Sequence, residues 1–267
     1  MDDILMNEIK QFSTKSEEND LTVVITDAST DVARAFAYKI LYDKTFGEDQ
    51  SICINLYDHP KRSFFLESVA IELTAFHPNL LKRINYSSDC SVSFVNTDVI
   101  VLIGNARGYT FTKEEFSDCF FLECVLAAKF YGEAIEKYAK SDVKIVTIGG
   151  TEATIVSRYA PSVPLKNITA LSILDLHFAK NHTAHFWISR ECLPQILHRF
   201  TNKSWHTRAL AYALADHIKY LWTGTPETEW TCMSVASDNS YGIPRNQFFS
   251  FPVICKDKEY QIVKVSS

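Results

Sequence analysis

Short apolar runs alternate with segments of helical periodicity over the first two thirds of the chain. The runs that predict buried strands, rich in β-branched residues, are residues 21–26, 51–57, 99–104, 143–148 and 167–172, with a shorter candidate at 83–86. Between them, apolar residues at helical spacing predict helices at 32–42, 63–76 and 116–138. Strands that alternate with helices in this way predict a parallel sheet covered by helices on both faces.

The pattern changes after residue 172. From 174 to 222 it is helical, with an interruption near Pro194, and three later segments, 230–236, 247–255 and 259–265, have the character of antiparallel strands. We therefore divide the chain into a polar N-terminal segment (1–20), an α/β region (21–172) and a C-terminal α+β region (173–267).

Composition narrows the classes of partner and location. The formal charge is −5 and no basic cluster occurs, which disfavours nucleic acid and anionic membrane surfaces as partners. The first twenty residues are acidic and mixed, unlike a targeting peptide, and no window has the length of a membrane span, so we expect a cytoplasmic protein. The seven cysteines are scattered without a C-x-x-C pair, which predicts reduced, mostly buried thiols and no zinc site.

The first two predicted strands and the helix between them have the order of a dinucleotide-binding unit. Asp58 ends the second strand, where such a unit places the acid that binds the ribose hydroxyls. The turn between the first strand and the helix has no glycine, so the close backbone approach to a pyrophosphate is lost. Asp27 and Asp31 instead place two carboxylates where the dianion would dock.

A structural reading of this turn is also available. Ser29, Thr30 and Asp31 are favourable residues for starting a buried helix. We favour this reading, because a carboxylate beside a pyrophosphate is repulsive in a cleft of low dielectric constant.

Several segments resemble the malate dehydrogenases, specifically the cytosolic type. The matches are densest at the C-terminus and lie at 216–218, 221–226, 240–244 and 249–253, with others at 46–50, 137–141 and 160–164. The motif losses and the run 158–161 also resemble the divergent branch called malate dehydrogenase 1B. The resemblance implies a Rossmann-type parallel sheet flanked by helices in 21–172, followed by a truncated α+β C-terminal domain of the malate dehydrogenase type in 173–267.

The resemblance also implies a chemistry. In this family malate is oxidised by hydride transfer to NAD, while a histidine oriented by an aspartate takes the hydroxyl proton and arginines hold the two carboxylates. Asp175 matches the orienting aspartate, and Arg107 matches one substrate-binding arginine of the lid. Phe178 stands where a second arginine is expected, and the segment with the catalytic histidine is missing.

The cofactor contacts implied by the resemblance are only partly kept. They fall on Asp58, Ser29, Gly104, Asn105 and Gly149. Gly150 stands where the family has an asparagine that contacts nicotinamide and substrate.

The remaining histidines have alternative interpretations. His177, His182 and His185 could form a replacement dyad or a metal site, but no matching carboxylate or cysteine spacing accompanies them, so we favour a solvated or partly buried helical face and predict no metal. His217 beside Asp216 has the character of a helix-surface pair.

Two functional hypotheses follow. The first is a family oxidoreductase with reduced or altered activity that binds NAD through Asp58 and the edge at Gly104 and uses Arg107 and Asp175. The second is a non-catalytic relative kept for its fold or surface, with an unidentified protein partner. Loss of a general base alone slows such chemistry about a hundredfold to ten-thousandfold. Since an arginine and the glycine turn are lost as well, we favour the second and predict no measurable malate-dependent NADH formation. The resemblance further implies a homodimer through the helix after the first strand and the late helix.

Overall fold

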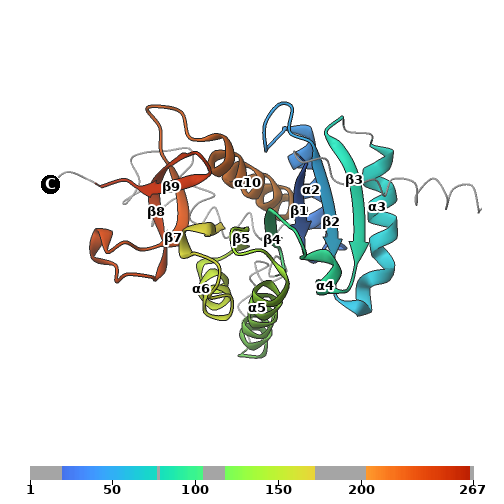
Figure 1. Cartoon of the computed structure of the whole chain (residues 1–267), viewed down its shortest axis with the longest axis horizontal. Helices are drawn as coiled ribbons and strands as arrows, with labels where there is room; N and C mark the ends of the chain where they lie inside the picture. Colours follow the sequence, from blue (N-terminus) through green and yellow to red (C-terminus); the bar gives the residue numbers. More distant parts are fainter. Residues whose placement is uncertain (1–19, 77–78, 105–117, 172–202, 265–267) are drawn as a thin grey trace, which may run out of the picture.

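One continuous sheet organises the molecule. The computed structural model describes residues 20–76, 79–104, 118–171 and 203–264. Within them the strands lie in the order β3-β2-β1-β4-β5-β6-β7-β8-β9 (Figure 1). The parallel part comprises β1 (Leu21–Ile25), β2 (Ile52–Tyr57), β3 (Leu81–Ser87), β4 (Val99–Leu102), β5 (Lys144–Ile148) and β6 (Ile168–Leu171). The antiparallel part comprises β7 (Thr231–Ala236), β8 (Phe248–Lys256) and β9 (Glu259–Ile262). The predicted parallel sheet is confirmed.

Helices cover both faces of the sheet. One face packs against α2 (Asp31–Tyr42), α3 (Leu66–Ala75) and α10 (Lys203–Thr223). The other packs against α4 (Cys90–Ser93), α5 (Asp118–Tyr138) and α6 (Gly150–Tyr159). Alternate residues of β1 explain the two layers, because Val23 and Ile25 point into the first core and Val24 into the second.

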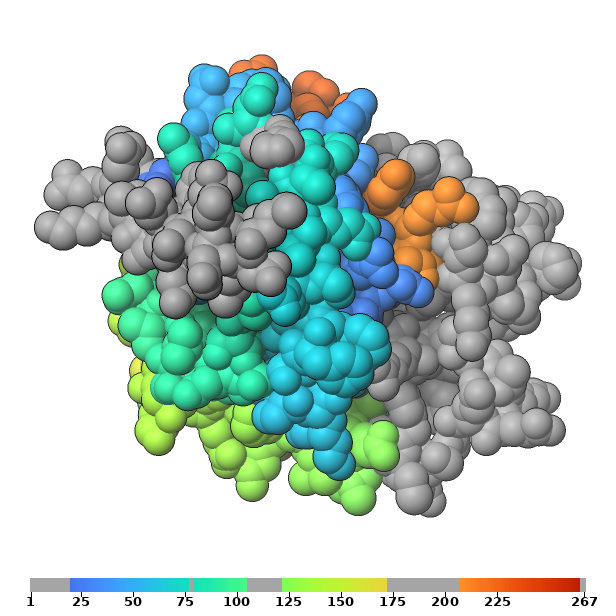
Figure 2. All heavy atoms as spheres, turned by 90° about the vertical axis from the view of Figure 1, so that its right-hand side faces the viewer, coloured from blue at the N-terminus to red at the C-terminus, as the bar shows by residue number. Residues whose placement is uncertain are grey.

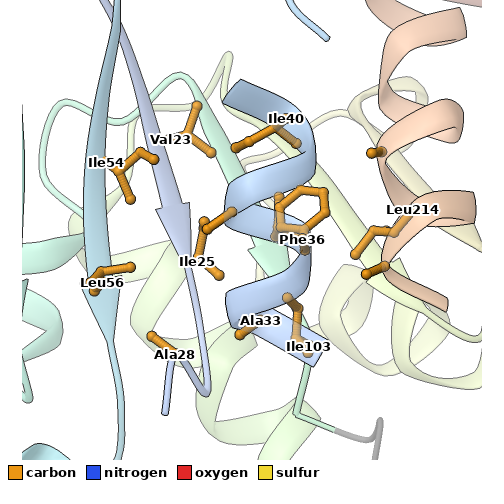
Figure 3. Packing of buried hydrophobic residues seen from close by; sticks show 14 of the residues in the cluster. Val23, Ile25, Ala28, Ala33, Phe36, Ile40, Ile54, Leu56, Ile103 and Leu214 are labelled. Atoms are coloured by element: carbon orange, nitrogen blue, oxygen red, sulfur yellow. The ribbon is translucent and has the colours of Figure 1, made fainter. Parts of the chain in front are cut away.

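The first core holds the turn after β1 in place. Figure 3 shows Phe36 and Ile40 of α2 between the sheet and Leu214 of α10. All three side chains are fully buried, and burial of each contributes about 1.5–3 kcal/mol. Thr30 caps the start of α2 by accepting a hydrogen bond from the backbone N–H of Ala33, as the helix-start reading predicted.

Three features differ from the prediction or were not predicted. The helix expected at 63–76 is divided into a 3₁₀ helix, η1 (Pro60–Phe65), and α3, because His59 and Pro60 start a tighter turn just after β2. The helices α4 and α6 were not predicted. The strand β7 pairs with β6 through Ala170 and Ser234, so the C-terminal strands extend the first sheet. The described residues also form the 3₁₀ helices η3 (Leu165–Asn167) and η5 (Ser240–Gly242).

The predicted boundary at 172/173 falls at the edge of a range that is not described. In the described ranges, no helix combines the length and the apolar character needed to cross a membrane. Four cysteines, Cys53, Cys90, Cys232 and Cys255, are buried, as predicted.

Candidate functional site: an ion cluster at the carboxyl edge of the sheet

The carboxyl ends of β1, β2 and β4 bring together residues far apart in the sequence. β1 pairs in parallel with β2 on one side and with β4 on the other. Asp27, Asp58 and Gly104 directly follow these strands or lie just beyond them, and they meet at one edge of the sheet. This is the edge where sheets of this type bind ligands.

Arg62 joins the two carboxylates. Its Nη2 lies 2.5 Å from Oδ1 of Asp27 and 2.6 Å from Oδ1 of Asp58, and its Nε donates to the same Asp58 oxygen at 2.6 Å. The η1 helix positions this side chain four residues after Asp58. Arg62 was not among the predicted site residues, although a basic residue four positions after an acid near a helix start is a recognisable pairing signal.

Asp58 has no oxygen left for a ribose in this arrangement. Besides Arg62, its Oδ1 accepts the backbone N–H of His59 at 2.7 Å, and its Oδ2 accepts the backbone N–H of Ser29 at 3.0 Å and the Ser29 hydroxyl at 2.6 Å. Burial alone would raise the pKa of Asp58, but the hydrogen bonds from Ser29 and Arg62 bring it below its usual range. Asp58 and Ser29, both predicted to contact the cofactor, therefore bind each other.

Asp27 lies at the centre of the edge. Its backbone has φ of 50°, in the left-handed region that favours glycine, although aspartate is among the residues that tolerate it. Its Oδ2 accepts a hydrogen bond from the Tyr131 hydroxyl of α5 at 2.9 Å. The same oxygen lies 2.9 Å from the position that a Cβ on Gly104 would take. The absence of a side chain at Gly104 thus leaves room for the carboxylate of Asp27.

The two acids of the turn have different surroundings. Asp27 is buried, and desolvation by burial raises its pKa in spite of the hydrogen bonds from Tyr131 and Arg62. The side chain of Asp31 is 82% exposed and pairs loosely with Arg34 on the surface of α2. Of the two carboxylates predicted to oppose a dianion, only Asp27 therefore lies at the site.

A cavity of about 950 Å³ adjoins the cluster. Asp27, Arg62 and Gly104 lie at one end. Its aromatic lining comes from β2 and α5 and consists of Tyr57, Phe130, Tyr131 and Tyr138. The volume is that of a small-molecule site.

Gly149 and Gly150 lie away from this cluster. Gly149 has φ of 107°, precedes α6 and donates its N–H to the carbonyl of Leu171 at 2.7 Å. A Cβ on Gly150 would lie 2.7 Å from Oγ of Ser234 and 3.4 Å from the carbonyl oxygen of Phe248. The antiparallel strands therefore approach closely where the resemblance led us to expect an asparagine.

The other predicted site residues fall outside the described residues. They are Asp175, Arg107 and Asn105, together with Phe178 and the three histidines at 177, 182 and 185. Among the residues that are described, no group of three or more histidine, cysteine or acidic side chains is placed to hold a metal ion.

The interpretation of His217 as a surface residue was wrong. Its side chain is buried, and its Nε2 lies 2.9 Å from the Thr169 hydroxyl of β6. Its Nδ1 has no hydrogen-bond partner among the described residues. Burial lowers the pKa of His217 from 6.5 to about 4, so the ring is neutral at physiological pH and serves packing.

Comparisons with known proteins agree with this architecture. Residues 202–267 match the family described as the lactate/malate dehydrogenase, alpha/beta C-terminal domain. The cytoplasmic malate dehydrogenase of Rattus norvegicus is 28% identical over 91% of this chain and 89% of its own length, and that of Taenia solium is 29% identical over the same shares.

Solved structures share the fold. The malate dehydrogenase of Naegleria fowleri superposes with a TM-score of 0.76 at 22% identity over 94% of this chain and 92% of its own. A Trichomonas vaginalis lactate dehydrogenase in complex with NADH and oxamate has a TM-score of 0.73 at 17% identity, over 92% of this chain and 91% of its own.

Proposed function

The chain belongs to the lactate/malate dehydrogenase family, and from this premise we propose that it is a divergent malate dehydrogenase-like protein that is catalytically impaired or inactive. The family reaction is the NAD-dependent interconversion of malate and oxaloacetate. The observation that carries the proposal is the guanidinium of Arg62 between Asp27 and Asp58. In this position the chain's own cation takes the hydrogen bonds that Asp58 would offer to a ribose.

The residues at the edge do not fit NAD as they stand. A pyrophosphate needs backbone N–H groups and a close approach at the turn, but the carboxylate of Asp27 lies there over Gly104. A dinucleotide would have to displace Arg62 from two carboxylates and would then face both of them unpaired. Electrostatic repulsion from these two carboxylates therefore opposes dinucleotide binding, and a glycine turn would not produce this repulsion.

The differences from the family's substrate site support the same proposal. Phe178 replaces an expected arginine, the histidine segment is missing, and Gly150 replaces the asparagine. Hydride transfer needs a docked nicotinamide, a base and a cationic clamp together, so the loss of any one of them is enough to lower the rate.

A second candidate is a weakly active NAD-dependent oxidoreductase for 2-hydroxy acids such as malate. The cavity of about 950 Å³ and the placement of Asp58 at the end of β2 favour it. In this case Arg62 would swing out of the cluster when the cofactor arrives.

Titration with NADH, followed by fluorescence and calorimetry, tests both candidates. An assay of oxaloacetate-dependent NADH oxidation follows, with the rat cytoplasmic malate dehydrogenase as positive control. We expect neither submillimolar binding nor turnover, which indicates a scaffold role. Binding without turnover would indicate a cofactor sensor, and binding with turnover would establish the second candidate.

We also propose a cytoplasmic homodimer. Relatives of the chain are named cytoplasmic malate dehydrogenases. Large apolar side chains are exposed on η1, α3 and α10: Phe64 (70%), Phe65 (48%), Ile71 (57%) and Tyr212 (48%). Figure 2 faces the side of the molecule on which η1 and α3 lie. A second copy of the chain would cover this surface, and an unidentified protein partner is the alternative.

A further inference from the structure

The ion cluster carries one negative charge that Arg62 does not balance. Two carboxylates, Asp27 and Asp58, share a single guanidinium. The other polar groups that face Asp27 come from α5 and β2 and are the phenols of Tyr131 and Tyr57, which are neutral at physiological pH. The described residues around Asp27 therefore leave the cluster with a net charge of about −1.

The unbalanced charge lies on Asp27. The oxygens of Asp58 accept hydrogen bonds from Ser29, His59 and Arg62, including two backbone N–H groups. Those of Asp27 accept one from Tyr131 and one from Arg62. Burial therefore raises the pKa of Asp27, whereas at Asp58 the hydrogen bonds from Ser29 and Arg62 outweigh burial and lower the pKa.

The position of Asp27 lets this charge influence which ligands enter the cavity. Asp27 lies between the cavity and the start of α2, where the helix dipole would otherwise attract an anion. A carboxylate at close range and low dielectric constant outweighs that attraction. The aromatic rings of the lining suit a flat, uncharged ring. The lining also contains charged side chains away from the cluster, namely Asp89, Glu123, Glu133 and Lys137.

We propose that Asp27 is the residue that determines which ligands the cavity admits: its carboxylate, held by Tyr131 and Arg62, excludes ligands with a phosphate at this edge and leaves uncharged aromatic ligands unaffected. This inference rests on the proposed function, since it explains why a family site rejects the dinucleotide. Removal of the charge at residue 27 then restores access for phosphates without any change in the shape of the cavity.

Asp27→Asn tests the proposal with little change in shape. Asparagine tolerates a φ of 50° and retains an oxygen that can accept the Tyr131 hydrogen bond. Asp31→Asn is the matched control, because it removes the same charge from the start of the same helix at an exposed position outside the cavity. The probes are NADH and adenosine, with dissociation constants measured by calorimetry at pH 7.5.

We expect Asp27→Asn to bind NADH at least tenfold more tightly than the wild type and Asp31→Asn do, while adenosine affinity is the same in all three. Wild-type affinity for NADH should also rise as the pH is lowered from 7.5 towards 5.5, the direction expected for a carboxyl group whose pKa burial raises. The rise should be smaller in Asp27→Asn, which keeps the other acids of the cavity, Asp89, Glu123 and Glu133. The wild-type pH series needs no variant, so it holds even if a variant fails to fold.

Three outcomes would overturn the inference. They are equal NADH affinity in the two variants, an equal gain for adenosine, and no NADH binding by any protein at either pH. Turnover of oxaloacetate by the wild type at pH 7.5 is a separate result, because it refutes the proposed function. The role of Asp27 is still decided by the comparison of NADH affinity between Asp27→Asn and Asp31→Asn.

Discussion

Protonation of His217 is expected to destabilise the fold as the pH falls. Its ring is buried beside Thr169, and burial lowers its pKa from 6.5 to about 4. Between these values the unfolded chain binds a proton that the folded chain does not. The stability due to the neutral ring is therefore complete above pH 6.5 and is lost progressively down to pH 4.

The size of this effect follows from the shift. A difference of 2.5 pKa units corresponds to about 3 kcal/mol in full, of which about 2 kcal/mol is lost between pH 7 and pH 5. This is a large share of the stability of an ordinary domain, which is about 5–15 kcal/mol.

Urea unfolding at pH 7 and pH 5 measures the effect in the wild type, His217→Gln and His59→Gln. Glutamine can still bond to Thr169 and does not titrate, whereas His59→Gln removes an exposed histidine as a control. The wild type and His59→Gln should each lose about 2 kcal/mol more than His217→Gln. An equal loss in all three would show that the buried imidazole is not the source.

Arg62→Met should lower the free energy of unfolding by about 3 kcal/mol in urea titration, since two carboxylates lose their shared cation, and a loss under about 1 kcal/mol would contradict this. Gly104→Ala should lower the free energy of unfolding by about 1–2 kcal/mol, because the added Cβ meets the Asp27 carboxylate. If thermal unfolding shows the same loss of stability in an Asp27→Ala background, that clash is not the cause. Ile71→Lys should convert the proposed homodimer into a monomer in sedimentation equilibrium while Ile254→Lys, equally an exposed isoleucine, does not; a monomeric wild type would refute the dimer.

The sequence was sufficient to predict the sheet and the edge at which the site forms. The β-branched runs and the helical spacing of Phe36 and Ile40 predicted β1, β2 and α2, because strands and helices buried on known faces leave a periodic pattern. The position of Asp58 at the end of β2 followed from the same pattern.

The pairing inside the site could not be predicted in the same way. Arg62 contacts Asp27 across 35 positions of sequence, and this contact depends on how η1 is oriented after β2. The buried position of His217, by contrast, follows from the sequence. It lies three residues after Leu214 and four before Leu221, so the helical period places it on the buried face in spite of its polar neighbour Asp216.

The Arg62 cluster has a consequence for how much of this protein a cell would hold. An ordinary dehydrogenase gains stability by mass action when its cofactor is abundant, so its lifetime follows the nucleotide pool. Here the guanidinium of Arg62 forms, within the chain itself, stabilising contacts with Asp27 and Asp58 at the edge where a cofactor would bind. If NAD does not bind, as we propose, the folded population is uncoupled from metabolic state, and the level of the protein is set by its synthesis and its intrinsic turnover.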